Sequence, residues 1–255
     1  MGKQDSTKTR VTPVFDKLRH ADPTGQAWVV PLLALPTRDG ATVDRIITPP
    51  LRANTLKFGA AEAQLEPPRS LLRWMVEHPE RLQWPKQADN LDPATQAKRK
   101  ALLANDSAVR AEALDLLAKG QPQQTWYVLE GRSRPDVYFE TDDAIVVIEG
   151  KRTELGPTRN VSWLAGRDQM LRHLDCAWEL RRNRRVFGFL IVEDEDGGGV
   201  PRKWRDACDE TIAADALERS LPHRTQDERE QFAASFLGAT TWSRVCDALG
   251  LECFR

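Results

Sequence analysis

The chain has 255 residues, of which 37 are Lys or Arg and 38 are Asp or Glu, so its formal net charge at pH 7 is -1. A chain of this length buries a substantial core as one elaborated domain or two small ones. The balanced charge excludes a protein held to nucleic acid by its overall charge. The sequence also lacks a Gly-x-Gly-x-x-Gly loop, a Walker loop, a Gly-x-Ser-x-Gly elbow and a metalloprotease His pair.

The N-terminal part of the chain carries no catalytic signature. Residues 1–20 are polar and predict a tail, and residues 21–106 predict an N-terminal elaboration with a strand at 42–48 and helices at 71–78 and 93–104. No stretch approaches the ~18 apolar residues of a membrane span, so we expect a cytoplasmic protein without membrane contact. The four cysteines include no close pair, so neither a zinc knuckle nor a disulfide framework is predicted.

A helix is predicted over residues 107–119, followed by a strand over 124–130. The apolar stripe of this helix is Val109, Ala113, Leu116 and Leu117, which puts Glu112 at its edge. In the following strand, Glu130 shares one face with Trp126 and Val128.

Two strands, at residues 137–139 and 144–148, follow as a predicted hairpin joined at 141–143. A two-residue loop, or a four-residue loop that includes Thr141 and Ala144, gives paired positions that sum to 285. Asp136 then lies directly opposite Glu149, and Lys151 projects from the same face because side chains alternate along a strand. Facing carboxylates repel unless something lies between them, and a divalent cation is the natural candidate.

This pattern resembles the PD-(D/E)XK nuclease superfamily, with Pro135-Asp136 as its first element and Glu149-x-Lys151 as its second. The resemblance implies an α/β protein with a restriction-endonuclease-like αβββαβ core and a mixed sheet, over residues 107–196. It also implies a Mg²⁺- or Mn²⁺-dependent phosphodiesterase, in which Asp136 and Glu149 bind the metal and Lys151 serves the attacking water. Most of that family acts on DNA, so DNA is the expected substrate.

A second helix is predicted over residues 163–182, with a core stripe of Leu164, Leu171, Leu174 and Trp178. Gln169, Arg172, His173 and Cys176 fall on the opposite face, which we expect to point away from the core. Some branches of the superfamily carry Gln-x-x-x-Tyr on this helix; here Gln169 is followed by His173, so the Tyr is absent. The resemblance implies catalytic roles for Gln169 and, on the earlier helix, for Glu112.

The segment from Lys151 to Arg185 is locally basic, with nine Lys or Arg against four Asp or Glu, a net charge of +5. A basic segment beside an acidic metal site suits a polyanionic substrate. We therefore expect nucleic-acid contacts from Arg152, Arg167, Arg172 and His173. A solvated basic helix face is the alternative.

The apolar run at residues 185–193 predicts a buried strand parallel to the strand that carries Glu149. Residues 197–255 predict a C-terminal helical segment, with helices at 202–219 and 226–249 in which Trp204 and Trp242 serve as packing anchors. The competing function is a catalytically silent module that keeps the fold and binds nucleic acid or protein. A homo-oligomer or a partner subunit stays open.

Overall fold

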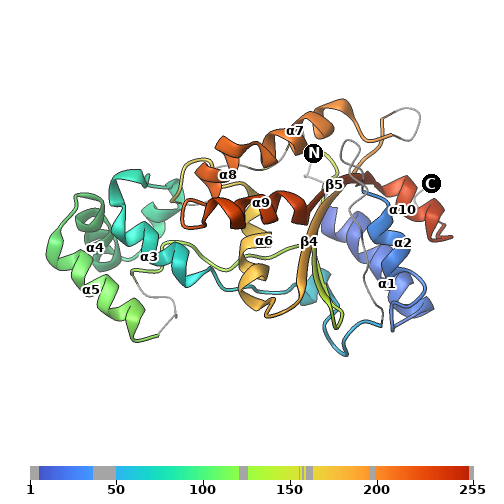
Figure 1. The fold of residues 1–255 in the computed structure, drawn as a ribbon, viewed down its shortest axis with the longest axis horizontal. Coiled ribbons are helices and arrows are strands. Elements are labelled where there is room, and N and C mark those ends of the chain that lie inside the picture. Colours follow the sequence, from blue (N-terminus) through green and yellow to red (C-terminus); the bar gives the residue numbers. More distant parts are fainter. Residues whose placement is uncertain are drawn as a thin grey trace.

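The computed structural model describes residues 6–36, 50–120, 126–154, 156, 158, 163–195 and 199–252. These residues form an α/β fold in which helices cover both faces of a five-stranded mixed sheet, and a further group of helices extends to one side (Figure 1). The α/β class and the mixed sheet predicted from the sequence are confirmed. The strand predicted at 42–48 lies outside the described residues.

The strands lie side by side in their sequence order, β1 to β5. β2 is antiparallel to both β1 and β3, whereas β4 is parallel to both β3 and β5. The strand bounds are Lys57–Phe58 (β1), Val137–Glu140 (β2), Ala144–Gly150 (β3), Arg185–Val192 (β4) and Phe236–Thr241 (β5).

The β2–β3 hairpin has the register predicted from the sequence. Val137 pairs with Ile148 and Tyr138 with Val147, so paired positions sum to 285. The backbone N–H of Thr141 donates to the carbonyl of Ala144 at 2.9 Å, and the Thr141 hydroxyl donates to Asp143 Oδ1 at 2.6 Å. The loop is thus the two-residue form, and the same register places Asp136, directly before β2, opposite Glu149.

The described residues include ten α-helices, and a short π-helix (η1, Thr7–Val11) precedes the first. The helix bounds are Thr12–Ala21 (α1), Val29–Ala34 (α2), Arg69–Glu77 (α3), Pro93–Leu103 (α4), Ser107–Ala118 (α5), Gln169–Leu180 (α6), Arg202–Ile212 (α7), Ala214–Ser220 (α8), Gln226–Ser235 (α9) and Trp242–Ala248 (α10). The described part of the chain contains no helix with the length and hydropathy of a membrane span.

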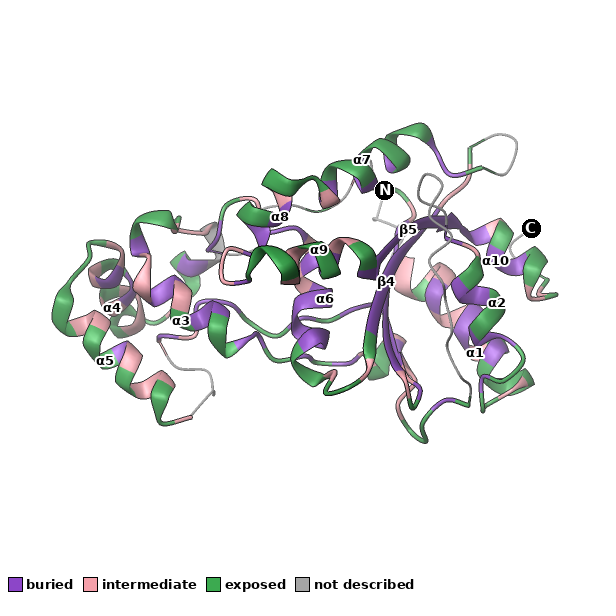
Figure 2. Ribbon diagram, in the orientation of Figure 1, coloured by how far each residue is buried: buried purple, intermediate pink, exposed green. Residues whose placement is uncertain are grey.

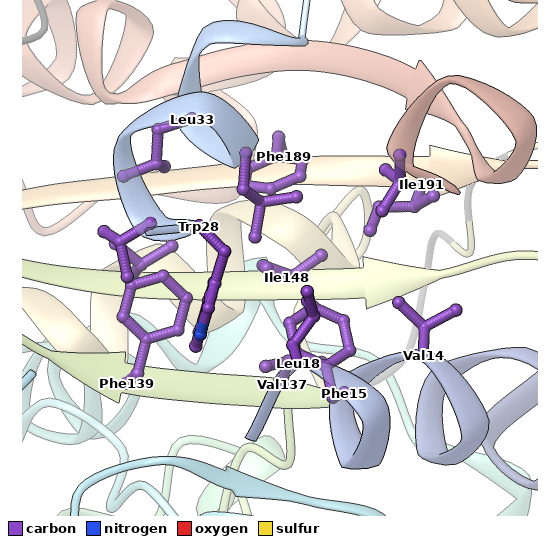
Figure 3. Packing of buried hydrophobic residues seen from close by; sticks show 14 of the residues in the cluster. Val14, Phe15, Leu18, Trp28, Leu33, Val137, Phe139, Ile148, Phe189 and Ile191 are labelled. Carbon is purple, nitrogen blue, oxygen red and sulfur yellow. The ribbon is translucent and has the colours of Figure 1, made fainter. Parts of the chain in front are cut away.

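One face of the sheet packs against α1, α2 and α10. Figure 3 shows Phe15 of α1 and Trp28 over Phe139, Ile148 and Phe189 of the strands. The Trp28 ring meets Phe15 and Phe139 edge-on, with centroids 6.2 and 5.6 Å apart. These strand residues alternate with others that face the opposite side, so the strands are buried on both faces (Figure 2).

The predicted polar tail at residues 1–20 is wrong for the described residues 6–20, which are helical. Val11, Val14, Phe15 and Leu18 recur at helical spacing and are all buried in this core. The residues between them are mostly polar, so the segment has the composition of a tail although its apolar residues share one helix face. This segment covers the sheet beside Asp136.

The second face of the sheet packs against α6, α7 and α9. Leu171, Leu174 and Trp178 of α6 are buried here as predicted, and so is Trp204 of α7. α6 begins at Gln169, later than predicted, because the Asp168 carboxylate caps it by accepting from the backbone N–H groups of Met170 and Leu171 at 2.9 and 3.1 Å. α6 provides the crossover between the parallel strands β3 and β4, as expected.

A third cluster holds α3, α4 and α5 together, away from the sheet. The prediction that α5 begins the core is therefore wrong. Residues 126–130 are not a strand either; residues 124 and 125 lie outside the described residues. Arg99 donates to the carbonyls of Trp126 and Val128 at 2.7 and 2.9 Å, so a side chain, not a neighbouring strand, satisfies this backbone. β1 occupies the place next to β2.

The C-terminal segment is not wholly helical. β5 interrupts the helix predicted at 226–249 and pairs in parallel with β4, while the helix predicted at 202–219 divides into α7 and α8 at Ala213. The sheet therefore takes strands from outside residues 107–196. Cys176 and Cys208 are buried thiols, but Cys246 is disulfide-bonded, which corrects the expectation of no disulfide.

Candidate active site

Glu149 is the centre of a buried polar cluster at the end of β3. Its Oε1 accepts from Lys151 Nζ at 3.0 Å and from Gln169 Nε2 at 2.7 Å. Gln169 also accepts from Lys151 Nζ at 3.0 Å through its own Oε1. The three side chains form a closed ring of hydrogen bonds. This ring fixes the end of β3 against the first turn of α6. Three of the predicted site residues are thus brought together.

His173, one turn further along α6, holds the other oxygen of Glu149. Its Nε2 lies 3.1 Å from Glu149 Oε2 and its Nδ1 lies 2.6 Å from Ser133 Oγ. His173 is 2% exposed, and Cys176 is also buried, so the prediction that this helix face points away from the core is wrong. The polar residues of this face contact Glu149, which lies 24 residues before His173 in the sequence. No pattern in the sequence marks Ser133 as a member of this cluster.

The Ser133, His173 and Glu149 side chains follow one another in the order of a hydrolase triad. Ser133, however, is 0% exposed, so its hydroxyl has no access to a substrate. We therefore interpret this chain of contacts as a support that orients the Glu149 carboxylate.

Asp136, directly before β2, is held by β3 and by the π-helix η1. Its Oδ2 accepts from the Gly150 backbone N–H at 2.8 Å, and its Oδ1 accepts from the Thr7 hydroxyl of η1 at 2.9 Å. Thr7, like Ser133, carries no signal in the sequence that links it to the site. Gly150 is required here because a Cβ would lie 2.7 Å from Val11 Cγ2 and 2.9 Å from Trp242 Cζ2. The packing of η1 and α10 thus sets how closely Asp136 approaches β3.

The two carboxylates have opposite acidities. Burial, and then the negative charge of Glu149, raises the pKa of Asp136 to about 7. Burial also acts to raise the pKa of Glu149, but the hydrogen bond and charge of His173 and the charge of Lys151 outweigh it and lower that pKa to about 2. Glu149 is therefore anionic at neutral pH, while Asp136 exchanges a proton near pH 7 unless another cation compensates its charge.

The residues present fit a magnesium-like ion that keeps part of its water. The described residues contain no group of three or more His, Cys, Asp or Glu side chains placed to hold a metal, so the protein offers the two carboxylates Asp136 and Glu149. Mg²⁺ is commonly bound by one or two carboxylates together with waters and substrate phosphates. A cavity of about 10 Å³, the space of roughly one water, is lined by Glu149, Lys151 and Gln169 among others.

Arg167 does not lie on a surface that could contact nucleic acid. It is 0% exposed and donates to both oxygens of Glu130 at 3.1 and 2.9 Å, to Asp175 at 2.8 Å and to the Ser220 carbonyl at 2.7 Å. The expected exposure is therefore wrong. This buried guanidinium, with two carboxylate partners, joins α6 to the segment before β2 and to the last residue of α8. Both oxygens of the Glu130 carboxylate are occupied by Arg167.

The other predicted basic contacts are also engaged within the protein. Arg172 Nη2 donates to the carbonyls of Gly131 and Arg132 at 2.8 and 2.9 Å. Arg152 Nε lies 3.7 Å from Glu193 Oε1, which also accepts from Arg10 at 2.6 Å. Arg152 and Arg172 are both partly exposed, with side-chain exposures of 20% and 17%, and Arg152 directly follows Lys151 in the chain.

Glu112 lies apart from this cluster. It is an exposed side chain on α5 and forms an ion pair with Lys98 of α4. Because α5 packs against α3 and α4, the structure does not bring Glu112 to Asp136 and Glu149. No family model, curated protein or solved structure matches this chain.

Proposed function

We propose that this chain is a metal-dependent nuclease that hydrolyses phosphodiester bonds of nucleic acid. The observation that carries the proposal is the buried pair of Asp136 and Glu149 with Lys151 Nζ 3.0 Å from Glu149. Burial, and then the negative charge of Glu149, raises the pKa of Asp136 to about 7, so the pair is suited to a compensating divalent cation, Mg²⁺ or Mn²⁺. The cation would neutralise phosphate charge and lower the pKa of a bound water.

The other side chains of the cluster have separate roles in the proposed reaction: Lys151 supplies positive charge, and Gln169 and His173 position their neighbours. Lys151 borders the water-sized cavity and places a positive charge where charge develops on a phosphate. Gln169 fixes both Lys151 and Glu149, and His173 fixes the plane of the Glu149 carboxylate. Each carboxylate oxygen has about two lone-pair sites, so Glu149 Oε2 can accept from His173 and still meet a cation.

The order of elements supports the same proposal. Helix α1, strands β1, β2 and β3, helix α6 and strand β4 follow one another as the αβββαβ core of the resembled superfamily requires, with α2 and α3–α5 inserted on either side of β1. The first helix and strand come from residues 12–58 and not from the 107–130 region predicted earlier. DNA is favoured as substrate by analogy with that superfamily.

The decisive experiment is a cleavage assay on linear, circular and single-stranded DNA and on RNA, with Mg²⁺ or Mn²⁺. We expect Glu149→Gln and Lys151→Met to lower the rate ~100-fold or more, about 2.7 kcal/mol in activation free energy. Glu112→Gln is the matched control and should keep its activity, because Glu112 lies outside the cluster.

Two results would contradict the proposal. Cleavage that persists in EDTA would show that no metal takes part, and full activity in Glu149→Gln would show that the cluster is structural. If the protein retains nucleic acid on a filter but cleaves none of the substrates, the competing function, a silent binding module, is favoured instead.

A further inference from the structure

The candidate active site is closed in this structure. Asp136, Glu149 and Lys151 are 9%, 6% and 5% exposed, and the cavity that borders Lys151 has a volume of about 10 Å³, the space of roughly one water. A phosphate group is larger than one water. A phosphodiester therefore reaches Lys151 only if a segment that covers the site moves.

Residues 6–10 form a strap over Asp136. The Thr7 hydroxyl donates to Asp136 Oδ1 at 2.9 Å, while the Gly150 backbone N–H donates to Oδ2 at 2.8 Å. Both oxygens of this carboxylate are therefore engaged by the protein. Of these two donors, the hydroxyl is the one that can leave without disturbing the hairpin, because Gly150 belongs to β3. Most of the strap belongs to η1, and π-helical turns are rare and often occur at functional sites.

A second contact holds the strap at its other end. Arg10 Nε donates to Glu193 Oε1 at 2.6 Å, and the two side chains are 16% and 34% exposed. Glu193 directly follows β4, and Arg152 Nε lies 3.7 Å from the same carboxylate oxygen. Glu193 thus offsets two positive charges beside the site. A polyanionic substrate would compete with Glu193 for both arginines.

Val11 anchors the chain directly after the strap. It is 0% exposed, and it packs so closely on Gly150 that a Cβ there would lie 2.7 Å from Val11 Cγ2. Helix α1, which follows Val11, also has three residues buried in the core. Residues 6–10, by contrast, are all partly or fully exposed. The strap can therefore open about Val11 while the core stays folded.

We propose that the strap is autoinhibitory. With Thr7 on Asp136 and Arg10 on Glu193 it blocks the cation site, and a polyanion that takes Arg10 from Glu193 releases it. This is a regulation of the candidate active site, so it rests on the proposed function. The cation then binds only to molecules in which the strap is open, and its apparent affinity is reduced by that fraction.

The test measures the binding of Mn²⁺ alone to the full chain, by the EPR signal of the free ion, and the hydrogen exchange of the backbone amides of residues 6–11. Arg10→Gln removes the ion pair with Glu193 at a partly exposed position. It should lower the Kd for Mn²⁺ about 5-fold and speed exchange in the strap by a similar factor, as expected for the loss of one partly buried ion pair. Thr7→Val removes the hydroxyl from Asp136 Oδ1 and should also lower the Kd.

A second arm tests the release by a polyanion. Duplex DNA added to the wild type in EDTA, where no metal is bound, should speed exchange in the strap. Arg73→Gln is the matched control for charge, because it removes an arginine from an exposed ion pair with Glu77 on α3. Its Kd for Mn²⁺ and its exchange rates should equal those of the wild type.

Three results would overturn the proposal. An unchanged or higher Kd in both Arg10→Gln and Thr7→Val would show that the strap supports Asp136 and does not block it. Unchanged exchange in Arg10→Gln, or in the wild type with DNA, would show that the Glu193 contact does not hold the strap. If neither the wild type nor any variant binds Mn²⁺, the proposed function fails as well, whereas wild-type binding with no change in the variants refutes the strap alone.

Discussion

Replacing Asp136 with Asn tests whether the carboxylate pair is built for a cation. In the metal-free protein, Asp136 is 9% exposed, and burial and the Glu149 charge raise its pKa from 3.8 to about 7. Because the pKa is raised on folding, the folded state binds the proton more tightly than the unfolded chain. The stability contributed by protonated Asp136 is complete below pH ~4 and is lost as the pH rises to ~7.

The magnitude follows from the shift. At 1.36 kcal/mol per pKa unit, ionised Asp136 costs about 4 kcal/mol above pH 7. Asn is neutral and its amide oxygen can accept from the Gly150 N–H, while its amide group can donate to the Thr7 hydroxyl. We expect Asp136→Asn to stabilise the metal-free protein by ~1–4 kcal/mol at pH 8, and by nothing measurable at pH 3.5.

The assay is thermal and urea unfolding of both proteins from pH 3.5 to 8, in EDTA and across a titration of Mg²⁺ or Mn²⁺ at matched ionic strength. Metal at 100 times its Kd should stabilise the wild type by about 2.7 kcal/mol and leave the Asn variant nearly unmoved. Asp142→Asn, at an exposed position of the hairpin loop, is the control. If Asp136→Asn destabilises the metal-free protein by more than ~1 kcal/mol, and metal shifts both proteins equally, the pair is structural.

Two further predictions concern stability alone. Arg167→Ala should destabilise the protein by ~3–5 kcal/mol, because it leaves Glu130 and Asp175 buried without their partner; a loss below ~1 kcal/mol in urea unfolding would contradict the buried network. Gly150→Ala should cost ~1–3 kcal/mol, since its Cβ would overlap Val11 and Trp242, whereas Gly131→Ala, with nothing within 4 Å of the new Cβ, should cost less. Equal melting temperatures for the two alanine variants would refute that packing argument.

Local patterns in the sequence were enough to determine the hairpin and the central strand. The β-branched runs on either side of Asp142-Asp143 allow a single register once the loop is two or four residues long, and this places Asp136 opposite Glu149. The apolar run at 185–192 is typical of a strand buried on both faces, and it forms β4. These contacts are short in sequence, so alternation and loop length suffice to predict them.

The tertiary structure decided the rest, because it concerns partners distant in the chain. Helical periodicity identifies which face of α6 is apolar, but it does not say whether the polar face meets water or Glu149, and here it meets Glu149. Arg167 looks like a surface charge until Glu130, 37 residues away, is placed against it. Likewise β5 has a weak strand pattern and becomes a strand by pairing with β4, because parallel pairing depends on a distant neighbour that no local pattern reveals.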